Sequence, residues 1–290
     1  MIEFTCNLCG RSNRCERAEL DRERASCSVC RSNVRTRGLL HALSMELFGA
    51  SLALPDFPRV KSLQGIGTSD VHQYAQILAD RFDYRNTFYD REPRFDVTNS
   101  PGEAFELYDF VISSEVLEHV VPPVETAFRN VYRLLKPHGV LVFTVPYSTE
   151  LSTAEHFPDL HEYGLTRLGD RLVLVNRTRE GAVQIFENPV FHLAASGPAL
   201  EMREFSETSL KELLAATGFT DVRIYAEDYP PFGIVHAEPW SLPLVARKGE
   251  FAFGSQPVRE MAEEYRSLKQ EIRRIGSSFW FRLGHKLGLV

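Results

Sequence analysis

The chain lacks any apolar run near the roughly 20 residues that a membrane-spanning helix needs, and no secretory signal peptide opens it. We therefore expect no transmembrane segment and a cytoplasmic location. Internal repeats and low-complexity tracts are also missing. Positive charge is in deficit, with a formal net charge of −6, which argues against a dedicated nucleic-acid binder because nothing offsets phosphate repulsion globally.

What is present is ordinary globular composition, 43% hydrophobic and 25% charged over 290 residues. A chain of this length can bury one sizeable core and carry small appendages. We divide it into a metal module, a connecting helix, a main domain with an insertion at 148–205, and a helical tail. Their ranges are 1–33, 34–58, 59–248 and 249–290.

All five cysteines lie within the first 30 residues. The pairs Cys6-x-x-Cys9 and Cys27-x-x-Cys30 are separated by 17 residues, a spacing typical of a four-thiolate zinc site. Two disulfides are the alternative, which a reducing cytosol disfavours. Four protein ligands leave no open position for substrate, so we predict a structural Zn²⁺. Cys15 is surplus, and we expect a free thiol there.

The module is locally basic, which has two interpretations. The arginines could read a nucleic acid, or they could be solvated surface charges. The positions concerned are Arg11, Arg14, Arg17, Arg22, Arg24, Arg31, Arg35 and Arg37.

Strand and helix patterns alternate through the main domain. A helix is predicted over Val34–Leu54, before Pro55 and Pro58, and a first strand with a glycine turn over Val60–Gly67. A remnant strand is expected at Phe95–Val97. Such alternation predicts an α/β fold with a doubly wound, mostly parallel sheet, in which ligands lie beyond the carboxyl ends of the strands.

The insertion and the tail depart from this alternation. Arg171–Asn176 and Ala182–Phe186 predict a β-hairpin, within a region that could cover the strand ends as a substrate lid. In the tail, apolar residues recur at alternating steps of three and four, from Val258 to Phe279. The pattern predicts either the seam of a homodimeric coiled coil or a helix docked on its own domain. Phe279-Trp280-Phe281 could also lie on a membrane surface.

One stretch resembles a known family. YDFVISSEVLEHV (Tyr108–Val120), followed by AFRNVYRLLKPHGVLVFTVPY (Ala127–Tyr147), closely resembles the fourth and fifth strands of class I S-adenosylmethionine-dependent methyltransferases. TAEHFPDLHEY, FENPVFH, LEMREFSE and PWSLPLVARK look like a type 11-like branch with an N-terminal CxxC…CxxC module. The resemblance covers about residues 1–248 and implies a seven-stranded Rossmann-like sheet.

The resemblance also implies cofactor-binding residues for S-adenosylmethionine. Leu63 to Ser69 matches the glycine turn after the first strand, although the family's acidic residue and third glycine are replaced by Leu63 and Ser69. A carboxylate after the second strand holds the ribose, and either Asp90 or Glu92 could do so. The remaining expected contacts follow the third and fourth strands. The full set is Gly65, Gly67, Asp90, Glu92, Asp96, Val97, Ser113, Ser114 and Glu115.

The catalytic candidates follow the fifth strand. A hydroxyl acceptor needs a base, and histidine suits that role near neutral pH. His156 and His161 come first and His192 third, while Tyr147 could line the acceptor pocket. Three functions compete: O-methylation of a small-molecule or sugar-type acceptor, RNA methylation with recognition by the zinc module, and non-catalytic binding by a methyltransferase fold.

Overall fold

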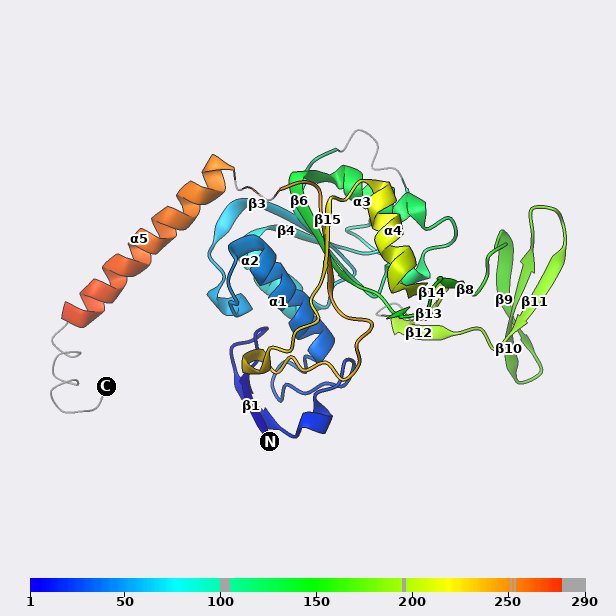
Figure 1. Cartoon of the computed structure of the whole chain (residues 1–290), viewed down its shortest axis with the longest axis horizontal. Coiled ribbons are helices and arrows are strands. Elements are labelled where there is room, and N and C mark those ends of the chain that lie inside the picture. The colour runs from blue at the N-terminus through cyan, green and yellow to red at the C-terminus, as the bar shows by residue number, and fades with distance from the viewer. Residues whose placement is uncertain (100–104, 195–196, 251, 253, 278–290) are drawn as a thin grey trace.

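The computed structural model of the chain (Figure 1) describes residues 1–99, 105–194, 197–250, 252 and 254–277. A six-stranded sheet forms its centre, in the order β15-β16-β6-β5-β3-β4. The four strands from β6 to β4 pair in parallel, and β16 runs antiparallel to both of its neighbours. The bounds are β3 Val60–Thr68, β4 Phe82–Thr87, β5 Tyr108–Ser114, β6 Leu135–Thr144, β15 Asp221–Ile224 and β16 Leu244–Arg247.

Helices cover both faces of this sheet, as Figure 1 shows. Successive side chains of a strand point to opposite faces, so Phe110 and Ile112 pack in one core while Val111 packs in the other. The first core contains α1 and α2, and the second contains α3 and α4. The helices are α1 Val34–Phe48, α2 His72–Arg81, α3 Glu125–Leu134 and α4 Glu207–Thr217. The predicted doubly wound sheet is therefore confirmed.

Two predicted elements are wrong in detail. The helix expected to reach Leu54 ends at Phe48, because Gly49 adopts a left-handed conformation (φ 64°) and its N–H caps Met45 O. Phe95–Val97 does not form a third strand, so the described sheet has six strands rather than seven. Its backbone turns back instead: Phe95 N donates to Phe88 O at 2.8 Å.

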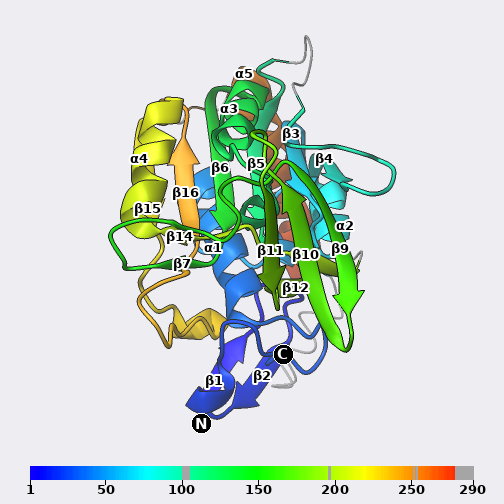
Figure 2. The same cartoon turned by 90° about the vertical axis from the view of Figure 1, so that its right-hand side faces the viewer.

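The insertion at 148–205 forms small sheets, in which all pairs except β7 with β14 are antiparallel. The predicted hairpin is confirmed as β10 and β11, and β9 extends it to three strands, which project from the body in Figure 1 and face the viewer in Figure 2. A short sheet, β7-β14-β8, links the insertion to the end of β6. The bounds are β7 Tyr147–Ser148, β8 Ala154–Glu155, β9 Glu162–Leu168, β10 Arg171–Arg177, β11 Val183–Glu187, β12 Phe191–Ala194, β13 Gly197–Leu200 and β14 Arg203–Ser206.

The N-terminal module shares its core with the main domain. It contains the hairpin of β1 (Ile2–Thr5) and β2 (Ser12–Cys15). Phe4, Leu8 and Leu20 are at most 4% exposed and belong to the same apolar cluster as α1 and β3.

The tail forms α5 (Ser255–Ser277), which extends away from the sheet in Figure 1. Its first turns are tied to the sheet, because Ser62 N donates to Glu260 Oε2 at 3.0 Å and Arg59 N to Glu264 Oε2 at 2.6 Å. The aromatic cluster Phe279-Trp280-Phe281 lies outside the described residues. Within the described residues, no helix combines the length and apolar character needed to cross a membrane.

Candidate active site

The carboxyl ends of the parallel strands bring a band of hydroxyl side chains together. Thr68 of β3 lies opposite Thr87 of β4 and Ser113 of β5, and Ser114 lies opposite Thr144 of β6. Thr68 Oγ1 donates to Ser113 Oγ at 3.0 Å, and Thr87 Oγ1 donates to Gly67 O at 2.7 Å. This edge is where doubly wound sheets bind ligands.

Gly65 and Gly67 lie inside β3 rather than in a turn, which corrects the predicted local structure. Pairing on both sides of β3 continues to Thr68, and the turn follows at Ser69 (φ 60°). A Cβ on Gly65 would collide with the Phe110 ring, and one on Gly67 with the Tyr84 hydroxyl and the Asp70 carboxylate. Close packing inside the protein thus accounts for both glycines, and their contact with a cofactor stays a prediction.

Asp70 fills the space beside Gly67. Its Oδ1 accepts from Tyr74 Oη at 2.6 Å, and its Oδ2 accepts from Tyr84 Oη. Asn86 fixes the Asp70 main chain through two hydrogen bonds of 2.8 and 3.0 Å. Burial raises the pKa of Asp70 to about 7, despite the two tyrosine hydrogen bonds.

The three carboxylates predicted beside the ribose and adenine differ in their engagement. Asp90 is exposed after β4 and forms no hydrogen bond or ion pair with the described residues. Glu92 Oε2 accepts from Arg94 N at 3.0 Å. Asp96 stabilises its own turn, because its Oδ1 accepts from Thr98 N and Oγ1. Neighbouring Val97 is buried. Of the three carboxylates, Asp90 is thus the one with both oxygens unengaged among the described residues, while Glu92 keeps Oε1.

The end of β5 is held by two arginines from the N-terminal part of the chain. Arg22 donates from Nη2 to Glu115 Oε1 at 2.7 Å and from Nη1 to Oε2 at 3.2 Å. Arg35 Nη1 donates to Ser114 Oγ at 2.5 Å. Burial of Glu115 opposes ionisation, but the charges of Arg22 and Arg35 hold its pKa below the usual value.

Sequence reasoning missed both arginines as site residues. They lie 93 and 79 residues before their partners, and a pattern of local spacing gives no signal at such a separation. They also line a cavity of ≈ 140 Å³, shared with His236, Trp240 and Ser241. A cavity of this size accommodates a small chemical group rather than a polymer.

A second group of polar side chains lies buried behind the β5 end. Glu118 is completely buried, and neither of its carboxyl oxygens has a hydrogen-bond partner among the described residues. Burial, together with the charge of Glu115, raises its pKa well above the usual value. His119 Nε2 lies 3.6 Å from Glu118 Oε1, and Arg203 of β14 donates to Val120 O at 2.7 Å. The insertion is therefore anchored beside the strand ends.

The four catalytic candidates are not brought together as one group. His156 lies at this anchor, with its Nε2 buried and 3.7 Å from Glu201 Oε1. Tyr147 is fully buried, and burial raises the pKa of its hydroxyl to about 12. His161 is exposed just before β9, and His192 is in β12 opposite Ala199.

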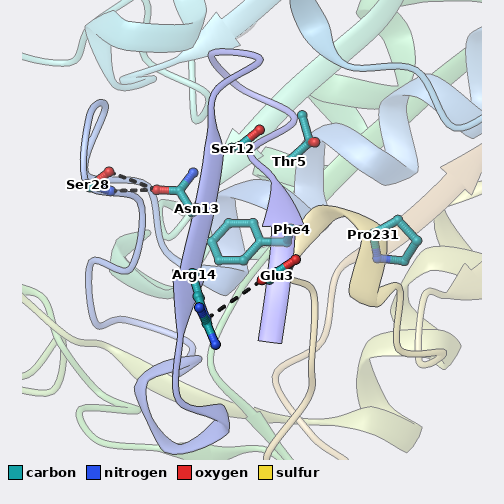
Figure 3. A pocket seen from close by; sticks show the side chains of 8 residues that line it. All are labelled: Glu3, Phe4, Thr5, Ser12, Asn13, Arg14, Ser28 and Pro231. Carbon is teal, nitrogen blue, oxygen red and sulfur yellow. Dashed lines mark hydrogen bonds and ion pairs between the residues drawn. The ribbon is translucent and has the colours of Figure 1, made fainter. Parts of the chain in front are cut away.

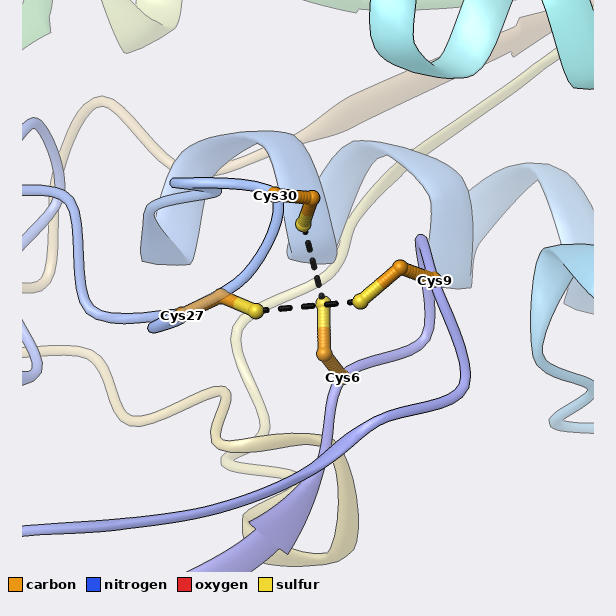
Figure 4. A group of neighbouring side chains, drawn as sticks. All are labelled: Cys6, Cys9, Cys27 and Cys30. Carbon is orange, nitrogen blue, oxygen red and sulfur yellow. Dashed lines mark hydrogen bonds between the residues drawn. The ribbon is translucent and has the colours of Figure 1, made fainter.

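The four predicted metal ligands do converge (Figure 4). All four sulfurs lie within 4.8 Å of one another. Cys6 and Cys30 Sγ are 3.6 Å apart, and Cys9 and Cys27 Sγ 3.7 Å. Tetrahedral zinc with bonds of about 2.3 Å requires sulfur separations of about 3.8 Å. The donor set thus fits Zn²⁺.

The backbone builds two similar turns around these sulfurs. Gly10 N donates to Cys6 O at 2.8 Å, and Arg31 N donates to Cys27 O at 3.1 Å. The residue after each second cysteine has a positive φ, 72° at Gly10 and 61° at Arg31. Cys15 is buried and lies outside the group.

A hollow of ≈ 600 Å³ lies against the β1–β2 hairpin (Figure 3). Its polar lining is engaged internally: Asn13 Oδ1 accepts from Ser28 N and Oγ at 2.9 and 3.0 Å, and Arg14 pairs with Glu3 at 3.7 Å. No strand of the central sheet contributes to its lining. The hollow is therefore separate from the candidate site.

Comparison with known proteins identifies the family. A family profile described as a methyltransferase domain matches residues 66–224, more than half of the chain. The chain belongs to the methyltransferase domain family. The predicted methyltransferase resemblance is thereby confirmed, while the cysteine module lies outside the matched residues. No curated protein matches the chain.

The solved structures that are similar to the chain include several methyltransferases. The 1,6-didemethyltoxoflavin-N1-methyltransferase of Burkholderia thailandensis, solved with S-adenosylhomocysteine, is 16% identical over 73% of this chain and 79% of its own, with a TM-score of 0.39. The sugar N-methyltransferase KedS8 of Streptoalloteichus is 15% identical over 65% of this chain and 81% of its own, with a TM-score of 0.39. The amino pentose methyltransferase CalS10 of Micromonospora echinaspora is 15% identical over 75% of this chain and 92% of its own, with a TM-score of 0.39.

Proposed function

We propose that this methyltransferase uses S-adenosylmethionine to methylate a hydroxyl of a small-molecule or sugar-type acceptor. The observation that carries the proposal is the strand edge of a methyltransferase domain with Asp90 beside it, exposed and unengaged. A carboxylate after β4 can accept hydrogen bonds from two ribose hydroxyls. Ser114 and the main chain after β5 offer polar contacts to the methionine portion, while Ser113 is buried and supports the strand end through Thr68.

S-adenosylmethionine, when bound, would supply an electrophilic methyl group that an acceptor oxygen attacks in line, with S-adenosylhomocysteine as the leaving group. The protein then positions the acceptor and removes its proton. We assign proton removal to His156, because Glu201 lies beside its buried Nε2 and can orient the ring. Tyr147 is a weaker base candidate, since its pKa of about 12 keeps it protonated near neutral pH. His161 lies on the exposed insertion.

The cysteine module is proposed to hold a structural Zn²⁺. Its contribution to the site is to carry Arg22, which fixes Glu115 at the end of β5. The RNA-reading alternative has less support, because several module arginines are already paired: Arg14 with Glu3, Arg17 with Asp228, and Arg22 with Glu115. The cytoplasmic location expected from the sequence stays a prediction.

Isothermal titration calorimetry with S-adenosylhomocysteine tests the proposal. Wild-type protein should bind it, and Asp90→Asn should weaken binding by about tenfold or more through loss of charged hydrogen bonds to the ribose. Glu92→Gln is the matched control in the same exposed loop and should bind within about twofold of wild type. No binding by the wild type at millimolar concentration would favour the non-catalytic alternative. Equal binding by wild type and Asp90→Asn would refute the ribose assignment alone.

A further inference from the structure

The second half of α5 carries an apolar stripe that the rest of the described chain leaves exposed. Tyr265 is 63% exposed, Leu268 52%, Ile272 69% and Ile275 48%. Earlier in the helix, Met261 is half-buried against the main core. Figure 1 shows the helix leaving the body beyond this contact. Intramolecular docking therefore accounts for Met261 and not for the remainder of the stripe, which includes Val258, 51% exposed.

The stripe has the composition of a two-stranded seam. Val258, Tyr265 and Ile272 occupy one heptad position, and Met261, Leu268 and Ile275 the other. β-Branched residues at the first position with leucine at the second favour parallel dimers, and Val258, Ile272 and Leu268 follow this preference. The stripe is narrow, with Glu264 and Glu271 along one edge and Lys269 along the other, whereas a helix that lies on an anionic membrane has a broad apolar face edged by cations.

The charges that flank the stripe favour a parallel over an antiparallel arrangement of two α5 helices. In a parallel, in-register pair, Glu264 of one chain lies beside the partner's Lys269, and the contact occurs twice by symmetry. In an antiparallel pair, glutamates would instead face each other across the seam. Glu264 uses only Oε2 to accept from Arg59 N, which leaves Oε1 for a second chain.

We propose that α5 is the interface of a parallel, two-fold dimer of this chain, centred on Tyr265, Leu268 and Ile272. The seam is about three heptads long, and an isolated helix of this length is marginal in water, so pairing and helix formation stabilise each other. We expect dissociation in the micromolar range. The proposal does not depend on the methyltransferase assignment.

Analytical ultracentrifugation of the full chain from about 1 to 100 µM tests it, with a dimer forming across this range. Leu268→Glu should give a monomer at every concentration, because it places a charge in the seam. Gln270→Glu adds the same charge on the outer face and should leave the dimer intact. Lys269→Glu should weaken the dimer, and the added substitution Glu264→Lys should restore it.

Three results would overturn the proposal. A wild-type chain that stays monomeric at 100 µM has no such interface. A Leu268→Glu variant that still dimerises places the contact elsewhere. A monomeric wild type that sediments with vesicles of anionic phospholipid, while Leu268→Glu does not, assigns the stripe to a membrane surface instead.

Discussion

The two ends of the chain are attached to the same sheet in different ways. The N-terminal module buries Phe4, Leu8 and Leu20 in the main core, and Arg22 reaches the end of β5. The C-terminal helix contributes one half-buried methionine and two carboxylates that accept backbone N–H groups. The first end is integrated into the fold and the site, and the second is an attachment with an open face.

The difference follows from what each segment can stabilise alone. A module of about 33 residues is too short to fold on its own core, so it needs a metal and a shared apolar surface. A helix of 23 residues makes most of its backbone hydrogen bonds within itself, and its stripe needs only one partner. Substitutions that destabilise the module should therefore destabilise the main domain as well, while substitutions in α5 should affect that helix alone.

Removal of a metal ligand should have the largest effect. Cys27→Ser should abolish stoichiometric zinc and lower the melting temperature by more than about 10 °C, because a structural zinc site contributes folding free energy directly. Cys15→Ser is the control and should keep both metal and stability, since Cys15 lies outside the four-sulfur group. Elemental analysis and calorimetry measure the two quantities. Full zinc content in Cys27→Ser would contradict the assignment.

One identical substitution compares the two ends. Leu20→Ala removes a side chain that is 3% exposed and should lower the free energy of unfolding by about 3 kcal/mol. Leu268→Ala removes one that is 52% exposed and, below the dimerisation range, should cost less than about 0.5 kcal/mol. Urea denaturation at 1 µM gives both values. Similar costs would mean that α5 is docked as firmly as the module.

A pH series should show that ionisation of the buried Asp70 lowers the free energy of unfolding. The folded-state pKa of Asp70, about 7, lies above its unfolded value of 3.8, so ionisation lowers the free energy of unfolding as the pH rises towards 7. Asp70→Asn cannot ionise. The variant should gain roughly 2–3 kcal/mol relative to wild type between pH 5 and pH 8. A difference that is constant with pH would show that Asp70 does not titrate in this range.

Two ion pairs of the module should differ in their contribution to the free energy of unfolding, by a smaller amount. Arg22→Ala removes the two hydrogen bonds from Arg22 to the half-buried Glu115 and should cost about 1–2 kcal/mol. Arg17→Ala breaks a pair with Asp228 at 3.5 Å in which both side chains are exposed, and should cost less than about 0.5 kcal/mol. Urea denaturation at pH 7 compares them. Equal costs would remove the argument that Arg22 joins the module to the strand edge.

The features that could be predicted from the sequence were those with local signals. The apolar run at Phe110–Ile112 correctly predicts a buried strand. The spacing of the two CxxC pairs correctly predicts that their four cysteines lie together. Gly67 misled the local prediction, because a glycine required by Tyr84 and Asp70 inside a strand looks the same in the sequence as one required by a turn. The third strand failed because Asp96 stabilises a turn through Thr98.

The contacts between distant parts of the chain could not be predicted. Nothing local marks Arg22 as the partner of Glu115 or Glu201 as the neighbour of His156. These contacts depend on how the module and the insertion pack against the sheet. They include the residues that most distinguish this site from a generic strand edge.

A crystal structure of the full chain with S-adenosylhomocysteine tests the central claim most directly. The account predicts the nucleoside beyond the ends of β3, β4 and β5, with its ribose hydroxyls on Asp90 and the homocysteine portion beside Ser113 and Ser114. Arg22 should remain paired with Glu115. A ligand bound elsewhere on the chain, or crystals that take up none at millimolar concentration, would contradict the account.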